Sequence, residues 1–466
     1  MSFISRKVIY RKKNVCTDNN LLKCNYDPNS NILKHLIECH NLDVNSKNKF
    51  GNNSLLIACR SSSNIKYIKY LIENYKMDIN EKNYEGDNCL LVACRKNPNL
   101  SIIKYLIQDC KIDINLKNNR SNNCLFLACH NKNIHVIKYL IEDLKMDKNI
   151  KNMDGDNCLL YACENHGNLN IIKYLIEECK MDFNLRNNFG KNCLLAACHH
   201  SKNTLIVKYL IEKCKMDINS EDNVGNNCLL LACNSNQNLN IIKYLVEDCK
   251  ISTNSKDNVG NNCLLLACKN NQNLNVIKYL VEDCKISTNS TNKFGNNCLI
   301  LACKKNKNLD VIRYLVEYCR VDVNFINNNN FNCLLVACYY NSTANIVKYL
   351  IENCKIDINL KNNYKENCLL VACLKNTNLD IIKYLIECQK MDINSVNKYG
   401  DNCLSLACTY NKNTDIIKYL IEKCNFNVND LSIDKISPSN MDFLKKNGYI
   451  NSTKTKNKIN KINLAK

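Results

Sequence analysis

Hydrophobic residues recur along the chain in a pattern that predicts pairs of short helices. In the segment 124–129, Leu125, Ala128 and Cys129 stand at spacings of three and four residues, which places them on one face of a helix. Asn123 precedes this segment, and an asparagine there can cap the helix by accepting backbone N–H bonds. A second apolar stripe follows each first one and predicts a second helix. In one copy this stripe consists of Ile102, Ile103, Leu106, Ile107 and Cys110.

The two-helix pattern repeats with a period of 35 residues. Its clearest motif, Asn-Cys-Leu-Leu-x-Ala-Cys, runs from Asn88 to Cys94 in one copy. Successive copies are 35 residues apart, except for one step of 34 between Cys124 and Cys158. A unit of two short helices cannot bury its own apolar stripes, whereas stacked neighbours bury them together. The sequence therefore predicts a solenoid of about eleven full repeats, preceded by a degenerate copy at residues 18–45.

Polar turns separate the predicted units. Eight of the ten glycines stand at one repeat position, as expected for a tight turn that needs positive φ. In three copies Ser121, Asn330 and Lys365 stand there instead. The glycines at this position are Gly51, Gly86, Gly155, Gly190, Gly225, Gly260, Gly295 and Gly400. An Asp-Ile-Asn element, such as Asp113 to Asn115, closes each unit.

The second predicted helix carries a recurrent Lys-Tyr-Leu sequence. In most copies the lysine stands four residues before a glutamate, as Lys173 and Glu177 do, and this spacing predicts an ion pair on the helix surface. The regular tyrosine could resemble a ladder for stacking nucleic-acid bases. We favour packing between the second helices of adjacent repeats.

These elements together resemble the ankyrin repeat. Asp222 to Gly225 matches that family's hairpin, Asn227 to Ala232 occupies the position of its first-helix signature, and Asp217 to Asn219 matches its closing element. Asn-Cys replaces the family's Thr-Pro, and leucine replaces its histidine. The resemblance covers residues 18–430 and implies an all-α, ankyrin-type solenoid of stacked helix–turn–helix repeats with inter-repeat hairpin loops. The Asn- and Lys-rich style is similar to ankyrin-repeat proteins of giant DNA viruses of amoebae.

Charge and composition change the picture mainly at the two ends. The formal net charge is +20, and residues 1–17 form a basic segment without any acid. Residues 431–450 are expected to form a C-terminal cap, with a flexible basic tail over 451–466. The N-terminus has no apolar core of a secretory signal, and no apolar run reaches the length of about 18 residues that a membrane span needs. We therefore expect an intracellular protein, cytoplasmic in the first instance, with a nuclear location as an alternative.

Candidate chemistry gives little support for catalysis. The 33 cysteines form no C-x-x-C pair, and Cys124 and Cys129 stand about 140° apart around a helix, so we expect buried, reduced thiols rather than zinc ligands. His130, His166, His199 and His200 could form a metal or pH-sensing patch. Solvated side chains at helix ends are the favoured interpretation. Because no nucleotide-binding or hydrolase motif is present, we expect no enzyme, no cofactor and no metal.

The resemblance implies that hairpin tips and first-helix ends bind partners. We expect a monomeric protein-interaction scaffold or adapter, and the resemblance suggests a viral factor that binds host proteins. Two alternatives stay open: a nucleic-acid or membrane-associated protein that acts through its basic tails, and a structural virion component. The near-identical copies 222–255 and 257–290 differ at Asn234 and Lys269, a first-helix end. The candidate protein-binding residues are Phe50, Tyr84, Arg120, Phe189, Phe294, Tyr364 and Tyr399 at the tips, with Arg95, Lys96, His199, His200, Lys304, Lys305, Tyr339 and Tyr340 at the helix ends.

Overall fold

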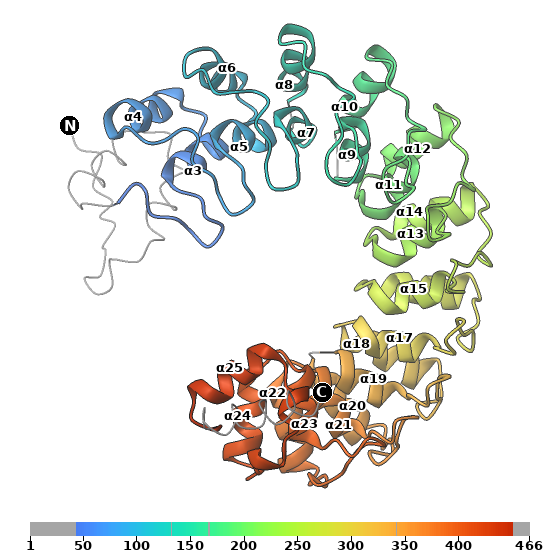
Figure 1. The fold of residues 1–466 in the computed structure, drawn as a ribbon. Coiled ribbons are helices and arrows are strands. Elements are labelled where there is room, and N and C mark those ends of the chain that lie inside the picture. Colours follow the sequence, from blue (N-terminus) through green and yellow to red (C-terminus); the bar gives the residue numbers. More distant parts are fainter. Residues whose placement is uncertain (1–42, 132, 166–167, 342, 451–466) are drawn as a thin grey trace, which may run out of the picture. The chain divides into compact units, whose positions relative to one another are not determined.

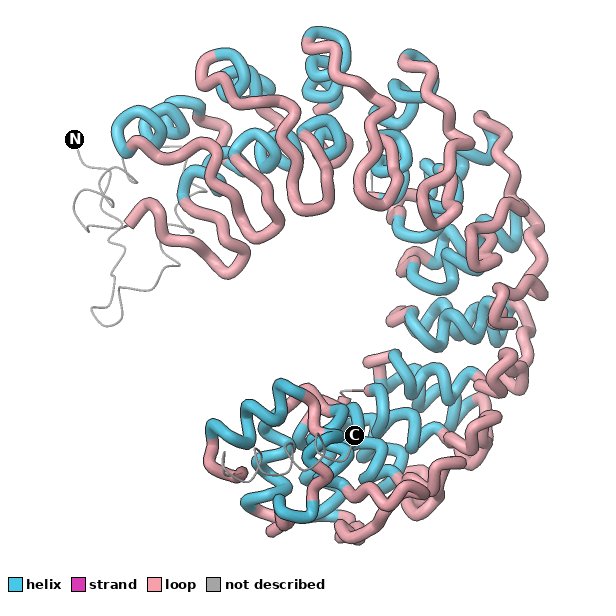
Figure 2. Tube along the Cα trace, viewed as in Figure 1, coloured by secondary structure: helices cyan, strands magenta, loops and turns pink. Residues whose placement is uncertain are grey.

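A computed structural model describes residues 43–131, 133–165, 168–341 and 343–450. Throughout these residues the chain forms helices, turns and loops, without a strand (Figure 2). Each repeat contains a first helix, a short turn and a second helix, followed by a loop that leads into the next hairpin (Figure 1). The all-α repeat architecture predicted from the sequence is confirmed.

The chain divides into two compact units, of which the first ends at Ile218. In this unit the first helices lie side by side in one row, and the second helices form another (Figure 1). The first helices are α3 (Ser54–Ser61), α5 (Cys89–Lys96), α7 (Cys124–Ala128), α9 (Cys158–Glu164) and α11 (Cys193–His200). The second helices are α4 (Ile65–Tyr75), α6 (Leu100–Gln108), α8 (Ile134–Lys138) with η2 (Tyr139–Asp143), α10 (Leu169–Lys173) with η3 (Tyr174–Glu178), and α12 (Thr204–Glu212).

The second unit starts at Asn219 and has the same two-row arrangement. Its first helices are α13 (Cys228–Ser235), α15 (Cys263–Asn270), α17 (Cys298–Lys305), α19 (Cys333–Tyr340), α21 (Cys368–Lys375) and α23 (Cys403–Tyr410). Its second helices are α14 (Leu239–Lys243) with η4 (Tyr244–Asp248), α16 (Leu274–Lys278) with η5 (Tyr279–Asp283), α18 (Leu309–Arg313) with η6 (Tyr314–Tyr318), α20 (Ala344–Glu352), α22 (Leu379–Lys383) with η7 (Tyr384–Cys388), and α24 (Thr414–Glu422).

Within each unit, the inner first helices are buried on nearly all sides because each packs against the first helices of the repeats before and after it. All side chains from Cys298 to Cys303 in α17 are buried, which removes enough apolar surface from water to hold such short helices in place. Asparagine caps the helices as predicted. Asn123 Oδ1 accepts bonds from the backbone N–H of Leu125 and Phe126.

The tyrosines of the second helices join adjacent repeats. Tyr174 is buried, its hydroxyl donates to Glu142 of the preceding repeat at 2.8 Å, and the ammonium of Lys138 lies 4.7 Å from its ring centroid. The same arrangement recurs at Tyr279 and Tyr314. Packing between second helices is therefore confirmed for the tyrosines. The predicted Lys–Glu pair within one helix is wrong, because both side chains turn towards the tyrosine of the next repeat.

A ladder of buried asparagines ties the first-helix ends together. In α17's repeat, Asn306 Nδ2 donates to the carbonyl oxygens of Cys268 (3.0 Å) and Asn271 (2.8 Å) in the preceding repeat. Its Oδ1 accepts from the backbone N–H of Asn308 at 2.9 Å. Equivalent asparagines make the same paired donations from Asn97, Asn131, Asn271, Asn341, Asn376 and Asn411.

The hairpins keep one geometry with or without glycine. Gly225 has φ of 78°, and a Cβ there would lie 2.5 Å from Asn258 Oδ1, so glycine also allows the next hairpin to approach closely. Ser121, Asn330 and Lys365 adopt the same left-handed conformation, with φ between 57° and 59°. Backbone bonds connect successive tips. The N–H of Asn258 donates to the carbonyl of Val224 at 3.0 Å.

A further helix, α25 (Pro438–Lys446), packs against α23 after two short turns, η8 (Val428–Asp430) and η9 (Ile433–Lys435). It lies in the segment where the sequence predicts a cap. Its buried Asn440 donates to the carbonyls of Cys408 and Asn411, as the asparagines of the ladder do. The predicted basic segments 1–17 and 451–466, and nearly all of the degenerate copy, lie outside the described residues.

Candidate binding surface

The structure exposes the hairpin-tip residues that the sequence predicts as contacts. Phe294 is 57% exposed and Tyr399 is 64% exposed. Large apolar side chains tend to be buried, so exposed aromatic rings at regular intervals suit contact with another molecule. The other exposed tip predictions are Phe50, Tyr84, Arg120, Phe189 and Tyr364.

In three repeats the residue after the hairpin glycine position contacts the residue after Ala-Cys. We call them the facing pair. Their spacing of eight residues in sequence brings the hairpin back over the end of the first helix. The pairs in contact are Asp87 with Arg95 at 2.8 Å, Lys191 with His199 at 2.9 Å, and Phe331 with Tyr339, whose ring centroids are 6.1 Å apart.

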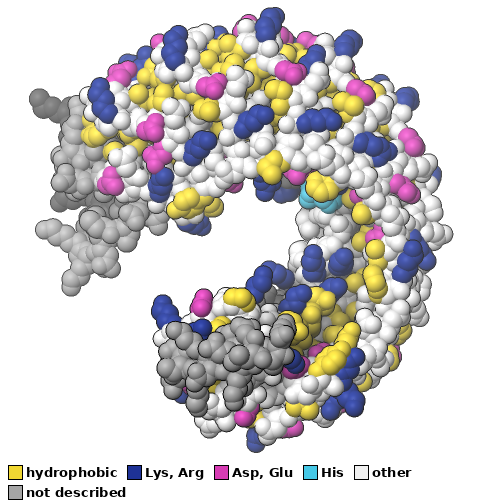
Figure 3. Space-filling model, viewed as in Figure 1, with side chains coloured by type: hydrophobic (Ala, Val, Ile, Leu, Met, Phe, Trp, Pro, Cys, Tyr) yellow, Lys and Arg dark blue, Asp and Glu magenta, His cyan; other side chains and the backbone are white. Residues whose placement is uncertain are grey.

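In the second unit, four successive first-helix ends form a cluster of lysines and tyrosines. We call Lys269, Lys304, Lys305, Tyr339, Tyr340 and Lys375 the Lys–Tyr cluster. The two tyrosine rings meet edge to face at 4.4 Å. The ammonium of Lys304 lies 4.5 Å from the Tyr340 ring centroid, and that of Lys375 lies 5.4 Å from both rings. Figure 3 shows lysine and arginine side chains beside hydrophobic ones along one edge of this unit.

Partial burial and repulsion between like charges both lower the pKa of lysines in this cluster. Burial lowers the pKa of Lys304, and the positive charges of Lys269, Lys305 and Lys375 lower it further. Burial and Lys305 likewise lower the pKa of Lys269, against a weaker opposing effect of Asp257. Sequence analysis identified Lys304, Lys305 and both tyrosines as candidates and noted Lys269 only as a difference at a first-helix end, but it missed Lys375. Its place directly before the ladder asparagine, the same as that of Lys305, is the signal that identifies it.

A smaller aromatic group lies at two neighbouring hairpin tips of the second unit. The rings of Tyr364 and Tyr399 are 6.4 Å apart between centroids. The ammonium of Lys398 lies 4.3 Å from the first ring and 4.9 Å from the second. Cation–π contacts of this kind hold exposed rings in place and keep their outer faces accessible.

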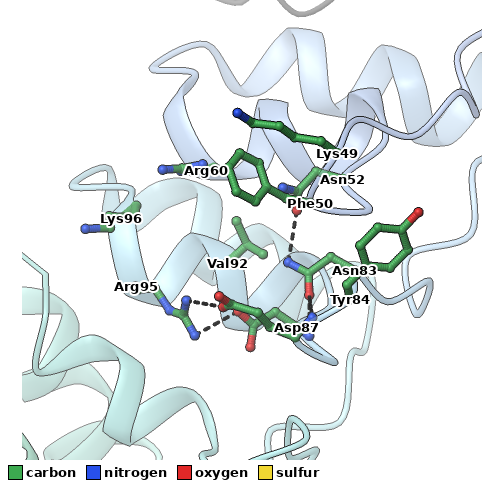
Figure 4. Close-up of a pocket in the computed structure, with 11 residues that line it drawn as sticks. Lys49, Phe50, Asn52, Arg60, Asn83, Tyr84, Asp87, Val92, Arg95 and Lys96 are labelled. Carbon is green, nitrogen blue, oxygen red and sulfur yellow. Dashed lines mark hydrogen bonds and ion pairs between the residues drawn. The ribbon is translucent and has the colours of Figure 1, made fainter. Parts of the chain in front are cut away.

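In the first unit, hairpin tips and helix ends surround a pocket (Figure 4). Phe50, Tyr84, Arg95 and Lys96 line it, together with Arg60. Arg95 does not point freely into the pocket. Its guanidinium forms ion pairs with Glu85 at 2.6 Å and with the buried carboxylate of Asp87 at 2.8 Å. Arg95 therefore serves a structural role, which the sequence analysis did not foresee.

Two of the predicted histidines meet a glutamate from the preceding repeat. Glu164 Oε1 lies 3.9 Å from His199 Nδ1 and 4.0 Å from His200 Nε2. The three ligand atoms lie within 4.8 Å of one another and could hold a metal ion. However, the ammonium of Lys191 lies 2.9 Å from His199 Nδ1 and 3.7 Å from Glu164 Oε1. A cation therefore already stands beside these groups. The expectation of a solvated side chain is wrong for His199, which is largely buried.

This cluster predicts acid sensitivity in the first unit. Burial raises the pKa of Glu164, but the nearby His199 and the charge of Lys191 outweigh it, so the pKa is lowered. A carboxyl group with a lowered pKa stabilises the fold above its unfolded pKa of about 4.3, and that contribution disappears as the pH falls further. We expect Glu164→Gln to lower the free energy of unfolding by about 1 kcal/mol at neutral pH. Denaturation of both proteins across pH checks this, and a gap that stays constant down to acid pH would contradict it.

The cysteines of the first helices lie in the core, as expected from the sequence, whereas those at the ends of the second helices, such as Cys110, are only partly buried and Cys388 is exposed. Cys129 and Cys158, from adjacent repeats, are both buried, and burial together with the neighbouring thiol raises the pKa of Cys129 well above its usual value. The same pairing across repeats recurs at Cys268 with Cys298. Thiols with a raised pKa stay protonated and are poor nucleophiles. The sequence analysis did not predict this close approach of thiols from adjacent repeats.

Across the described ranges, every helix is too short or too polar to span a bilayer. A family model described as ankyrin repeats (3 copies) matches residues 21–118, 93–187, 166–257, 264–362 and 334–430. A search of the curated proteins found no match.

Proposed function

Because the chain belongs to the ankyrin-repeat family, we propose that it is a non-enzymatic scaffold that binds another protein through its hairpin tips and first-helix ends. Ankyrin repeats generally serve as protein-interaction modules. The observation that carries the assignment to this surface is the Lys–Tyr cluster, continued by the exposed rings of Phe294, Tyr364 and Tyr399. Aromatic side chains with basic neighbours are typical of residues that dominate the energy of protein interfaces.

We further propose that the protein acts as a monomeric adapter inside a cell. In this proposal the protein is a viral factor and its partner is a host protein. Buried, protonated thiols such as that of Cys129 suit a reducing compartment. The Asn- and Lys-rich repeats support the viral origin only through the resemblance described above.

Photo-crosslinking in the full-length chain tests the surface assignment. A photoreactive phenylalanine analogue would replace Phe294 at a hairpin tip and, as the matched control, Tyr318 at the end of the second helix of the same repeat. Both residues are aromatic and well exposed, at 57% and 65%. We expect a discrete covalent product with one protein from position 294, and its loss when Tyr339 and Tyr340 are both alanine. Equal products from both positions would contradict the assignment.

A further inference from the structure

The facing pair shows where this chain supplies its own counter-ions and where it does not. In α5's repeat the pair is Asp87 with Arg95, and Glu85 at the hairpin tip adds a second carboxylate to the same guanidinium. The basic side chain is thus neutralised within its own repeat. The buried Asp87 also accepts a bond from Asn118 Nδ2 at 2.8 Å.

In the repeats of α15 and α17 the corresponding positions lack these carboxylates, whereas Glu366 takes the place of Asp87 in α21's repeat. In α17's repeat, Phe294 stands where Glu85 does and Asn296 stands where Asp87 does, opposite Lys304. In α15's repeat, Val259 and Asn261 take the same two places opposite Lys269. Asn296 keeps the structural bond, since its Oδ1 accepts from Asn327 Nδ2 at 2.8 Å. The hairpin framework is therefore the same and the negative charge is missing.

The lysines are consequently left with one another. Of the ion pairs among the described residues, none involves Lys269, Lys304, Lys305 or Lys375. Asp257 acts on Lys269 only as a weak opposing charge. Glu366 lies near Tyr339, and its carboxylate accepts a bond from Asn362 Nδ2 at 2.8 Å within its own hairpin. Partly buried like charges without counter-ions raise the free energy of the unbound protein, and a negatively charged ligand would relieve this repulsion.

We infer that the Lys–Tyr cluster binds a short acidic segment of the protein partner. This inference rests on the proposed function and names the chemistry of its ligand. The cluster spans four first helices packed about 10 Å apart, so its length is about 30 Å. An extended segment of about ten residues covers this length. Carboxylates would pair with the lysines, and apolar side chains between them would lie against Tyr339 and Tyr340.

The ends of the cluster favour a short peptide over a nucleic acid. The next first-helix ends carry Asn234 and Ser235 on one side, and Thr409 and Tyr410 on the other. A nucleic-acid strand carries a charge at every nucleotide and would gain most from a basic track that continues along the repeats. A bounded patch with two central tyrosines and neutral flanks matches a ligand with few charges and some apolar surface.

The test uses fluorescence anisotropy on the full-length protein with labelled probes. One probe is a peptide of about ten alternating glutamate and leucine residues, the second has glutamine in place of glutamate, and the third is oligothymidylate of matched length. The decisive variant is Asn296→Asp, which restores the internal counter-ion of Lys304 and can still accept the bond from Asn327. Ser287→Asp is its control, with the same charge change on an exposed loop, at a position where Asp113 stands naturally in another repeat.

We expect the acidic peptide to bind the unmodified protein, and Asn296→Asp to weaken that binding about tenfold. Ser287→Asp should leave it unchanged, and Lys304→Gln should reproduce the loss without adding a charge. The glutamine peptide should not bind. Equal weakening by both aspartate variants, or tighter binding of oligothymidylate that the same variants weaken, would overturn the inference. If the acidic peptide fails to bind while the crosslink from position 294 persists, the acidic ligand is refuted and the protein scaffold stands.

Discussion

Replacing Asn306 with alanine is expected to lower the free energy of unfolding of the second unit by about 3 kcal/mol. The Asn306 side chain is fully buried and satisfies three backbone groups at once: the carbonyls of Cys268 and Asn271, and the N–H of Asn308. Alanine would leave all three without a partner in a region closed to solvent. Because stability in a stacked array depends on the interfaces between neighbours, the loss at one interface should separate the repeats on either side. Chemical denaturation followed by circular dichroism measures it.

Two comparisons make this prediction specific. Asn289→Ala changes the same residue type on an exposed loop of the preceding repeat and should be within about 0.5 kcal/mol of the unmodified protein. Asn306→Ser should lose less than alanine, since Ser201 occupies the same position naturally and its hydroxyl accepts the equivalent N–H bond at 3.1 Å. A serine variant as unstable as the alanine variant would show that the accepted bond from the backbone N–H of Asn308 contributes nothing measurable to stability, which would contradict this explanation.

The ladder also shows why part of the fold could be predicted from sequence and part could not. The period, the helix pair and the capping asparagines follow from local spacing, since Asn123 needs only its own helix to act as a cap. The role of Asn306 depends on carbonyls that lie more than thirty residues earlier in the chain, which periodicity cannot reveal. The mistaken prediction of a Lys–Glu pair has the same cause. A tyrosine from the next repeat competes for both side chains, as Tyr174 does for Lys138 and Glu142.

The candidate site residues also divide into those that follow from local sequence and those that depend on a residue elsewhere in the fold. Exposure at tips such as Phe294 follows from their place in a turn, so the sequence predicted it. Whether a charged helix end is available to a partner depends on the residue that faces it. Lys304 has an amide, Asn296, at the facing position, and Arg95 has a buried carboxylate there. The basic residues at the helix ends do not reveal this difference by themselves. The eight-residue spacing of opposite charges at Asp87 and Arg95 was a signal in the sequence, but it carries meaning only once the hairpin is seen to fold back over the helix.

Arg95→Ala should therefore act as a stability variant, with an expected loss of about 3 kcal/mol at neutral pH. The variant leaves Asp87, whose side chain is 1% exposed, as a buried charge without its cation. The double variant Asp87→Asn with Arg95→Ala has an uncharged amide at position 87, as the equivalent positions Asn261 and Asn296 have naturally. It should recover most of the loss, because the amide can still accept the bond from Asn118.

The pH dependence of the Arg95→Ala loss separates this explanation from lost packing. Burial raises the pKa of Asp87 above its ordinary value, and Arg95 opposes that rise. Without Arg95 the folded pKa rises further above the unfolded one, so the penalty is complete above the folded pKa and vanishes as the pH falls through the unfolded value of about 3.9. The melting temperatures of the unmodified protein and of Arg95→Ala should therefore approach each other towards acid pH. The difference in melting temperature between Asp87→Asn and the double variant should not change with pH in this way. A gap between Arg95→Ala and the unmodified protein that is independent of pH would show that the arginine acts through packing of its aliphatic stem and not through its charge.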